Sequence, residues 1–437
     1  HRGVTSGIDD DAWASIRRTR VFLKAPITTP QGGGFKSLNV TTRVALGLFA
    51  NVRPAVAYHP YVPTKHPGMD LVIIRENEED LYAGIEHRQT ADVMQSLKLI
   101  TRPGSERIIR YAFDYAVRNG RSKVTCFTKD NIMKMSDGLF HDVFEEVAAE
   151  YPDVESEHWI VDIGAAKLAD TPEAFDVVVL PNLYGDILSD VAAQIAGSVG
   201  LAGAANIGQD AAMFEAIHGS APRRAGQNVA NPSGLLNAAV LMLLHLNQTD
   251  TAQAIQNAWL TTLEDGVHTY DVFDPSTSAK KVGTREFGEA VVERLGHEPQ
   301  NLTPVRYAPS SGNNTAAWEV RPASRPAKAT IGVDVFIDWE GGTGATLAEW
   351  VKPLASDGLE LQMISNRGVK VWPGGFGDGY RVDHWRCRFV TADRQPVTHA
   401  AIAGLLARFA EAGLDFIKTE HLCTFDGEPS YSLAQGE

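Results

Sequence analysis

The chain has 437 residues, more than one ordinary domain needs, so two or three hydrophobic cores are expected. Apolar residues make up 44% and charged residues 22% of the sequence, which excludes a fibrous or disordered protein. The formal net charge of −14 argues against nucleic acid and membranes as partners, because both attract a basic surface. Cys126, Cys387 and Cys423 are odd in number and far apart, so neither a disulfide framework nor a cysteine zinc site is expected.

The first predicted elements follow a strand, loop, helix order. A β-rich run, 20–24, leads into a loop rich in proline and glycine, 25–34, and apolar residues at helical spacing follow in 37–49. Upstream, the sequence begins with His-Arg-Gly and has neither an initiator Met nor a signal pattern. We therefore expect that residues preceding this start are missing.

Further along, continuous apolar runs alternate with amphipathic ones. Three runs are typical of buried strands: 71–74, 124–127 and 177–180. The helical patterns 106–117 and 139–149 separate them, and this alternation predicts a mainly parallel sheet. The longest apolar run, 235–246, is shorter than the roughly 20 residues that a membrane-spanning helix needs, so it is interpreted as a buried helix.

A change of composition marks a domain boundary. Residues 305–330 are rich in Pro, Ser, Ala and Asn, which indicates a linker. The elements predicted beyond it are strand 331–336, helix 347–354, strands 359–365 and 380–390, helix 402–412 and strand 416–419. This βαββαβ order is typical of a ferredoxin-like domain.

Two carboxylates, Asp186 and Asp190, follow the strand 177–180 and stand four residues apart. On a helix they share one face and repel each other by about 0.2–0.5 kcal/mol unless a cation lies between them. Carboxylate oxygens suit Mg²⁺ or Mn²⁺, and ligands of parallel α/β proteins gather where the strands end. The alternative is an acidic helix start that the helix dipole stabilises.

A basic cluster is predicted near these carboxylates. Arg43 and Arg53 flank the end of the first predicted helix, and Arg75 follows a buried strand. Arginine binds carboxylates bidentately, so the three suit a substrate with several carboxylates, although each alone is more often ion-paired or on the surface. Ser37 and Asn39 begin the helix after the glycine-rich loop, where free backbone N–H groups can bind a further carboxylate. Alternatively, Ser37 is only a helix cap.

Proton transfer and nucleotide binding have their own candidates. Lys129, which follows a predicted strand, and Tyr82 could transfer protons, although most lysines in such places are solvated. The loop His-Gly-Ser-Ala-Pro-Arg-Arg starts at His218, and Arg223 and Arg224 offer charge for a phosphate, although such a segment is often only a loop. Because no G-x-G-x-x-G follows a predicted strand, a Rossmann dinucleotide site is not supported.

Several motifs occur together in this sequence, in the order in which they follow one another in a known family. They are Thr28-Thr29-Pro30 with Gly32-Gly33-Gly34, Ser37-Leu38-Asn39-Val40, Arg75-Glu76-Asn77 with Asp80-Leu81-Tyr82-Ala83-Gly84, Lys129 with Asn131-Ile132-Met133-Lys134, Gly185-Asp186 with Ser189-Asp190, and His218-Gly219-Ser220-Ala221-Pro222. In this combination the chain closely resembles the homodimeric isocitrate dehydrogenases, which belong to the β-decarboxylating (isocitrate/isopropylmalate) dehydrogenase family. The resemblance runs from about Arg20 to about Pro304.

The resemblance implies a two-domain α/β fold of the isopropylmalate dehydrogenase type, which differs from the Rossmann fold. It also implies a small α+β (βαββαβ) C-terminal domain. The implied parts are a large nucleotide-binding domain from 1–50 and 197–310, a small domain with a dimer clasp from 51–196, a linker at 311–329 and the C-terminal domain at 330–437. The last resembles the extra domain of some bacterial members and is expected to pack on its own or the partner subunit. The opening strand and Gly-Asp-Gly-Ile-Gly-Pro loop of the family are not in this sequence, so the large domain is expected to lack its N-terminal part.

The implied reaction, a step of the tricarboxylic acid cycle, is oxidative decarboxylation of isocitrate to 2-oxoglutarate and CO₂ with reduction of NADP or NAD, dependent on Mg²⁺ or Mn²⁺. The resemblance implies that the substrate is bound by Ser37, Asn39, Arg43, Arg53 and Arg75. The metal ligands are Asp186 and Asp190 with Asp162 from the partner subunit. Lys129, also from the partner, handles the hydroxyl proton, and Tyr82 protonates the enol. The active site then needs two chains.

The implied cofactor-binding residues are Thr29, His218, Gly219, Arg223, Arg224, Asn231, Tyr270 and Asp271. The two positions after His-Gly-Ser-Ala-Pro usually hold Lys-Tyr in NADP enzymes of the family and an acidic with an aliphatic residue in NAD enzymes. The two arginines found here favour NADP, because they attract a ribose 2′-phosphate. Asp274 stands where familiar NADP enzymes carry an arginine, so NAD stays open.

Two other functions stay open. One is a sister enzyme that acts on homoisocitrate or an alkylmalate, and Ser37 and Asn39 argue against it because the family meets an alkyl group with apolar residues. The other is a catalytically silent dimeric module that binds a partner protein, and the retention of every candidate catalytic and metal-binding residue argues against that. The expected compartment is the bacterial cytoplasm, with the mitochondrial matrix as the alternative.

Overall fold

The structure is a computed structural model, which describes residues 7–29, 37–309, 325–375 and 379–437. The chain divides into two compact units, 1–83 with 98–320 and 84–97 with 321–437. Both the predicted large domain and most of the predicted small domain fall within the first unit, so the boundary between them stays a prediction. The predicted linker lies largely outside the described residues, because 310–324 are not described.

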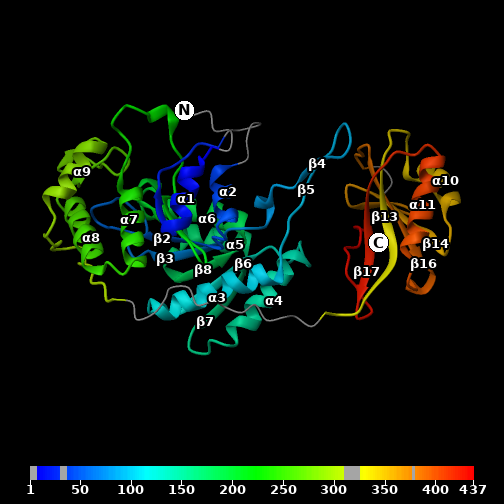
Figure 1. The fold of residues 1–437 in the computed structure, drawn as a ribbon, viewed down its shortest axis with the longest axis horizontal. Helices are drawn as coiled ribbons and strands as arrows, with labels where there is room; N and C mark the ends of the chain where they lie inside the picture. Colours follow the sequence, from blue (N-terminus) through cyan, green and yellow to red (C-terminus); the bar gives the residue numbers. More distant parts are fainter. Residues whose placement is uncertain (1–6, 30–36, 310–324, 376–378) are drawn as a thin grey trace. The chain divides into compact units, whose positions relative to one another are not determined.

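An eight-stranded sheet is the centre of the first unit, with the strand order β1-β10-β9-β2-β3-β8-β6-β7 (Figure 1). The strands are β1 Val21–Lys24, β2 Ala50–Val56, β3 Asp70–Glu76, β6 Lys123–Thr128, β7 Glu155–Ile160, β8 Val177–Leu180, β9 Gly203–Ile207 and β10 Ala212–Ala216. All three predicted buried strands are confirmed within this sheet. Other short strands are β4 Glu86–Arg88, β5 Met94–Ser96, β11 Val267–His268 and β12 Lys280–Lys281.

Parallel pairing predominates in the sheet, as predicted, but the sheet is mixed, and its antiparallel strands β2 and β9 were not predicted. Strands β3, β8, β6 and β7 are parallel, as are β1 and β10, but β2 and β9 run antiparallel to both of their neighbours. The reason lies in the connections. β9 and β10 are joined by a tight turn, closed by a hydrogen bond from Gly208 N to Ala211 O (2.8 Å), and such a turn can join only antiparallel strands.

The helices of the first unit are α1 Asp10–Thr19, α2 Leu38–Ala45, α3 Arg102–Arg118, α4 Ser136–Ala148, α5 Val161–Asp170, α6 Asn182–Ala196, α7 Ser233–His245, α8 Thr249–Glu264 and α9 Thr284–Glu293. The predicted helix 37–49 ends earlier, before Gly47, whose φ of 61° does not continue a helix. The run 235–246 forms α7, but most of its side chains are half-buried rather than buried. Within the described ranges, no helix combines the length and the apolar character that a membrane crossing requires.

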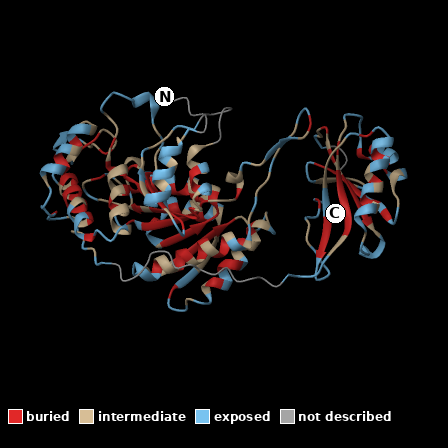
Figure 2. Cartoon of the chain, in the orientation of Figure 1, coloured by how far each residue is buried: buried red, intermediate tan, exposed pale blue. Residues whose placement is uncertain are grey.

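Alternate residues of the central strands face two different hydrophobic cores, as the pleat of a strand requires. Val72 and Ile74 pack toward α3 and α4, whereas Leu71 and Ile73 pack toward α5 and α6. Figure 2 shows the buried residues running along the strands, with exposed residues on the outer helix faces. Because α6 buries Leu188, Ala192 and Ala196 in the core that contains Leu71 and Ile73, its opposite face is free to carry polar groups.

The second unit contains a six-stranded sheet in the order β15-β14-β16-β13-β17-β18. Its elements are β13 Lys328–Asp338, α10 Gly344–Val351, β14 Leu359–Asn366, β15 Val369–Trp372, β16 His384–Thr391, α11 His399–Glu411, β17 Phe416–Phe425 and β18 Glu428–Pro429. The predicted βαββαβ order is confirmed, with antiparallel pairing of β14, β16, β13 and β17. The strand predicted at 380–390 begins only at His384, and β15 was not predicted.

Two polar contacts hold the second unit together. Arg388 on β16 binds Asp334 on β13 bidentately and fully buried, with Nε to Oδ1 at 2.8 Å and Nη2 to Oδ2 at 2.9 Å. The pair belongs to a larger network, because Arg388 Nη1 also lies 3.0 Å from Glu437 Oε2 and Arg386 Nη1 lies 3.7 Å from Asp334 Oδ2. The hairpin of β4 and β5 joins this unit through Thr90, whose hydroxyl donates to Asp383 Oδ1 at 2.5 Å.

Candidate active site

Helix α6 carries the predicted acidic pair. Asp186 and Asp190 lie one turn apart on the face opposite the buried Leu188 and Ala192. Arg53 Nη1 lies 3.3 Å from Asp186 Oδ1 and 3.7 Å from Asp190 Oδ1, so the two carboxylates share one face of the helix as expected. Their side chains are 36% and 57% exposed, which leaves oxygen atoms accessible to a ligand.

The electrostatics of the pair suit a cation. Burial and the charge of Asp186 raise the pKa of Asp190 above its ordinary value, although Arg53 acts in the opposite direction. Burial also acts to raise the pKa of Asp186, but the charges of Arg75 and Arg53 outweigh it and hold that pKa below its ordinary value. A divalent cation between the carboxylates would remove their repulsion, so the donor set fits Mg²⁺ or Mn²⁺.

Two of the three predicted arginines, Arg53 and Arg75, contact this pair, and the charge of the third, Arg43, acts on Asp186. Arg53 lies on β2 and Arg75 on β3, neighbouring strands of the sheet, and both side chains are buried together with Arg43. Arg75 forms an ion pair with Asp186 and donates to Asn182 Oδ1 through Nε (3.0 Å) and Nη2 (2.7 Å). Burial, with the charges of Arg53 and Arg43, lowers the pKa of Arg75 to about 9. The positive charges of the guanidinium groups thus repel one another, and an anionic ligand would reduce this repulsion.

Sequence reasoning missed Glu215, which orders the basic cluster from β10. Its carboxylate lies 2.9 Å from Arg43 Nη2 and 2.7 Å from Lys24 Nζ. A single glutamate inside the apolar strand 212–216 was the available signal, because a buried carboxylate needs a cationic partner.

Glu215 predicts a pH dependence of stability. Burial acts to raise its pKa, but Arg43 and Lys24 lower it from 4.5 to about 2. The folded state therefore gains stability that is complete above the unfolded pKa and is lost as pH falls through the folded pKa, about 3 kcal/mol in total. In urea titrations, the advantage of wild type over Glu215→Gln should shrink by about 1 kcal/mol between about pH 6 and about pH 3.5. An advantage that stays constant over this range would contradict the assignment.

The start of α2 brings Ser37 and Asn39 to the same region. Ser37 occupies the N-cap position, but its side chain makes no capping hydrogen bond, and its Oγ accepts instead from Thr29 Oγ1 at 3.0 Å. The alternative in which Ser37 is only a helix cap is therefore weakened. Asn39 Oδ1 and Arg43 Nε are buried without a hydrogen-bond partner among the described residues. Buried polar atoms of this kind usually bind something, which is consistent with a ligand site here.

Tyr82 lies in the short 3-10 helix Leu81–Ala83 beside the acidic pair. Its hydroxyl donates to Asp186 Oδ2, and the guanidinium carbon of Arg75 lies 4.7 Å from the centre of its ring. Burial and the charge of Asp186 raise the pKa of Tyr82, although Arg75 acts to lower it. Tyr82 is thus a protonated donor at neutral pH.

Lys129 and Asp162 form a pair of their own. Lys129 follows β6 and Asp162 lies in the first turn of α5, with Nζ and Oδ1 2.6 Å apart. Asp162 does not come together with Asp186 and Asp190 within this one chain, because the one group of three potential metal ligands within 4.8 Å in the described ranges consists of other residues. A single chain thus does not assemble the predicted set of three aspartates.

The predicted cofactor residues form two clusters. The side chain of Arg224 contacts the hydroxyl of Tyr270, with the guanidinium carbon 4.6 Å from the ring centre. Asp271 Oδ2 accepts from Asn231 Nδ2 (3.1 Å) and from Ser198 Oγ (2.5 Å). Asp274 is held by its own turn, because its Oδ1 accepts from the backbone N and the hydroxyl of Ser276 at 2.8 and 2.6 Å.

The loop that starts at His218 has contacts of its own. His218 Nδ1 and Gly219 O are 2.9 Å apart, and Ser220 contacts Thr28. The charge of His218 acts on the carboxyl group of Asp190, which connects the loop to the metal-binding candidates. Arg223 is exposed and close to Arg224 in the same short helix, Pro222–Arg224.

Comparison with known proteins decides the family. The sequence profile of the isocitrate/isopropylmalate dehydrogenases matches residues 2–291, about two thirds of the chain. The chain belongs to this isocitrate/isopropylmalate dehydrogenase family. A second profile, the C-terminal domain of bacterial isocitrate dehydrogenase, matches residues 328–437, so the predicted resemblance of both parts is confirmed.

The relatives within the family agree with this. The chain is 54% identical to the NADP-dependent isocitrate dehydrogenase of Rickettsia felis over 433 residues, 99% of this chain and 90% of the relative. It is 46% identical to the enzyme of the same name from Thermus thermophilus, over 100% of this chain and 87% of the relative. A crystal structure of a Thermus thermophilus protein superimposes with a TM-score of 0.92 at 44% identity, covering 100% of this chain and 88% of the other. The expected non-Rossmann fold of the family is confirmed.

Proposed function

We propose that the chain is an NADP-dependent isocitrate dehydrogenase that oxidises and decarboxylates isocitrate to 2-oxoglutarate and CO₂. The observation that carries this proposal is the cluster of three buried arginines at the carboxylate pair of α6, where Arg53 and Arg75 contact Asp186 and the charge of Arg43 acts on it. Such a site favours a polyanion that also carries an oxygen ligand for a metal, and isocitrate has three carboxylates and a hydroxyl. The NADP-dependent isocitrate dehydrogenases among its relatives support the same reaction.

The substrate carboxylates would be held by Arg43, Arg53 and Arg75, with Ser37 and Asn39 at the start of α2. The unpartnered Nε of Arg43 supports this arrangement, because it can donate to a bound carboxylate, whereas the unpartnered Oδ1 of Asn39 needs a donor such as the hydroxyl group of the substrate. Glu215 and Asn182 act as positioning residues, since each fixes the guanidinium group of one arginine. The electrostatic repulsion among the arginines falls when the anion binds.

Asp186 and Asp190, with Asp162 of a second chain, would hold Mg²⁺ or Mn²⁺. Such an ion, when bound, supplies Lewis-acid stabilisation of negative charge on the substrate oxygens. Lys129 accepts the proton of the hydroxyl group, and Tyr82 donates a proton to the enol carbon after CO₂ leaves. The raised pKa of Tyr82 supports the second role, because the phenol stays protonated until a strong base forms beside it.

A homodimer would complete this site. Lys129 and Asp162 pair with each other and not with the acidic pair of their own chain, which is expected if they serve the active site of the partner. Large apolar side chains near both groups are exposed, namely Ile163 on α5 and Ile187 on α6. Apolar surface of this kind on two neighbouring helices supports a subunit interface.

NADP is favoured by Arg223 and Arg224, and the cofactor preference can be changed. We expect Arg223→Ala with Arg224→Ala to raise the KM for NADP⁺ by about 10–100-fold, because the contacts with the 2′-phosphate are lost. The KM for NAD⁺, which lacks this phosphate, should change little. Steady-state kinetics with both cofactors measure the effect. Arg306→Ala is the matched control, since that exposed arginine contacts Glu298 (2.7 Å) and Val305 O (3.0 Å), neither of which is a predicted cofactor residue. An equal rise of both KM values would contradict the proposal.

Substrate comparison tests the reaction itself. We expect 2-oxoglutarate and NADPH to form in equal amounts from isocitrate, with far lower kcat/KM for 3-isopropylmalate and homoisocitrate. A preference for either of these two would instead identify a sister enzyme. Binding of all three without any turnover would support the catalytically silent module.

A further inference from the structure

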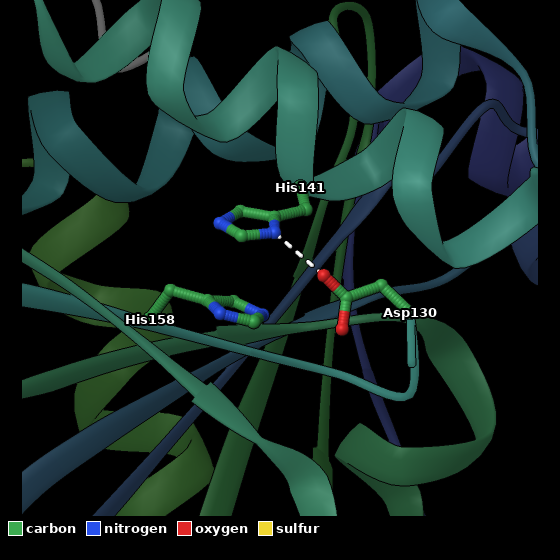
Figure 3. A group of neighbouring side chains, drawn as sticks. All are labelled: Asp130, His141 and His158. Carbon is green, nitrogen blue, oxygen red and sulfur yellow. Dashed lines mark hydrogen bonds and ion pairs between the residues drawn. The ribbon is translucent and has the colours of Figure 1, made fainter. Parts of the chain in front are cut away.

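A second group of metal-ligating side chains lies apart from the acidic pair. Asp130 follows β6, His141 lies on α4 and His158 on β7, and each offers one ligand atom, all within 4.8 Å of one another. Figure 3 shows the two imidazole rings one above the other, with the carboxyl group of Asp130 facing their edges. None of the three side chains has a role in the proposed reaction.

The group is held by stacking of its two rings and by one contact between His141 and Asp130. The ring centroids are 3.5 Å apart with 16° between the planes, and His141 Nδ1 lies 2.7 Å from Asp130 Oδ2. Two imidazolium charges at this separation would repel each other strongly, so at least one ring is neutral. Burial and the charge of His141 lower the pKa of His158, which makes this ring the neutral one. A neutral imidazole is the form that binds metals.

We propose that Asp130, His141 and His158 bind a Zn²⁺ ion at a site separate from the carboxylates of α6. Two imidazole nitrogens and one carboxylate oxygen are a ligand set typical of Zn²⁺ with one open position, whereas Mg²⁺ prefers oxygen ligands alone. On a tetrahedral ion with bonds of about 2.0–2.2 Å, ligand atoms lie about 3.3 Å apart. The ligand atoms of the group lie within 4.8 Å of one another and His141 Nδ1 lies 2.7 Å from Asp130 Oδ2, so an ion requires the side chains to rotate as it binds.

Neighbouring side chains would orient the ligands. Thr128 Oγ1 lies 2.8 Å from His158 Nε2, and Glu145 Oε1 lies 3.5 Å from His141 Nε2. Contacts of this type fix the ring orientation of metal-binding histidines. A cavity of about 320 Å³ adjoins the group and is lined by both histidines, Glu145 and Glu157. It gives an ion a path to the ligands, and its carboxylates attract a cation.

The test is Zn²⁺ binding to the chelator-stripped, full-length protein, measured by isothermal titration in excess Mg²⁺, which occupies the carboxylates of α6. We expect one Zn²⁺ per chain, bound at least about tenfold more weakly by His141→Gln, His158→Gln and Asp130→Asn. His421→Gln is the matched control, because His421 stacks on His399 with centroids 5.2 Å apart and lies outside the group of three. This variant should bind Zn²⁺ as the wild type does.

A second measurement separates loss of ligands from loss of folding. Co²⁺ bound to two imidazoles and a carboxylate absorbs visible light strongly, and this absorption should disappear in Asp130→Asn, which preserves the shape of the side chain. Circular dichroism spectra of all variants should match the wild type. The proposal is overturned if the wild type binds no Zn²⁺ in excess Mg²⁺, or if the three variants bind it unchanged. Neither readout requires turnover, so the result is independent of the proposed function.

Discussion

Asp186→Asn should lower kcat for isocitrate by about 10³-fold or more, because the variant loses a charged metal ligand where negative charge develops on the substrate. Asp186 is also the partner of Arg53, Arg75 and Tyr82, so the change disturbs the arginine cluster and the proton donor together. We expect Mn²⁺ binding to weaken in parallel, which equilibrium dialysis can measure.

The matched control for this change is Asp170→Asn. Asp170 also lies on a helix and forms an ion pair, with Lys167 Nζ at 3.8 Å, but it is exposed at the end of α5. Its kcat and Mn²⁺ affinity should equal those of the wild type. A loss of less than about tenfold in Asp186→Asn, with unchanged Mn²⁺ affinity, would show that α6 does not hold the metal.

Lys129→Met should be nearly inactive as a homodimer, with a loss of about 10²–10⁴-fold expected for removal of a general acid–base group. If the active site is shared, this variant and Asp186→Asn should complement each other. In a mixed dimer, one site then combines the intact Asp186 of one chain with the intact Lys129 of the other. The second site carries both changes and stays inactive.

Mixed dimers, purified with two different affinity tags, should therefore recover about half of the wild-type activity. Lys129 is 27% exposed and Asp162 67% exposed in the single chain, so both side chains can be reached by a partner. Dimers of Lys129→Met with itself, purified in the same way, are the control for the tags. Mixed dimers as inactive as their parents would indicate an active site built within one chain.

The elements that the sequence predicted well are those with a strong local pattern. β8 matches the run 177–180 because four consecutive apolar residues are buried in the middle of a sheet. α1 was not predicted, since none of its residues is buried and its apolar side consists only of the half-buried Trp13 and Ile16. The antiparallel pairing of β2 and β9 could not be predicted either, because neighbours in a sheet depend on contacts between distant segments.

In the candidate active site, too, the features with a local sequence pattern were predicted and those that depend on distant residues were not. The spacing of Asp186 and Asp190 predicted their common helix face directly. Glu215 and Asn182 were not predicted, because their importance depends on arginines 172 and 107 residues away in the sequence. The Asp130, His141 and His158 group was missed for a similar reason, since only the packing of α4 beside β6 and β7 brings it together. Such long-range partners are invisible to local pattern analysis.

Metal-dependent oxidation of isocitrate by NADP⁺ is tested most directly by following nicotinamide reduction spectrophotometrically. Protein, isocitrate and Mn²⁺ are combined with NADP⁺ or with NAD⁺, and each assay is repeated with excess chelator. We predict reduction of NADP⁺ with a kcat/KM at least about tenfold above that for NAD⁺, its loss in chelator and its recovery when Mn²⁺ is restored. Failure to reduce either cofactor, or turnover that persists in excess chelator, would contradict a metal-dependent isocitrate dehydrogenase.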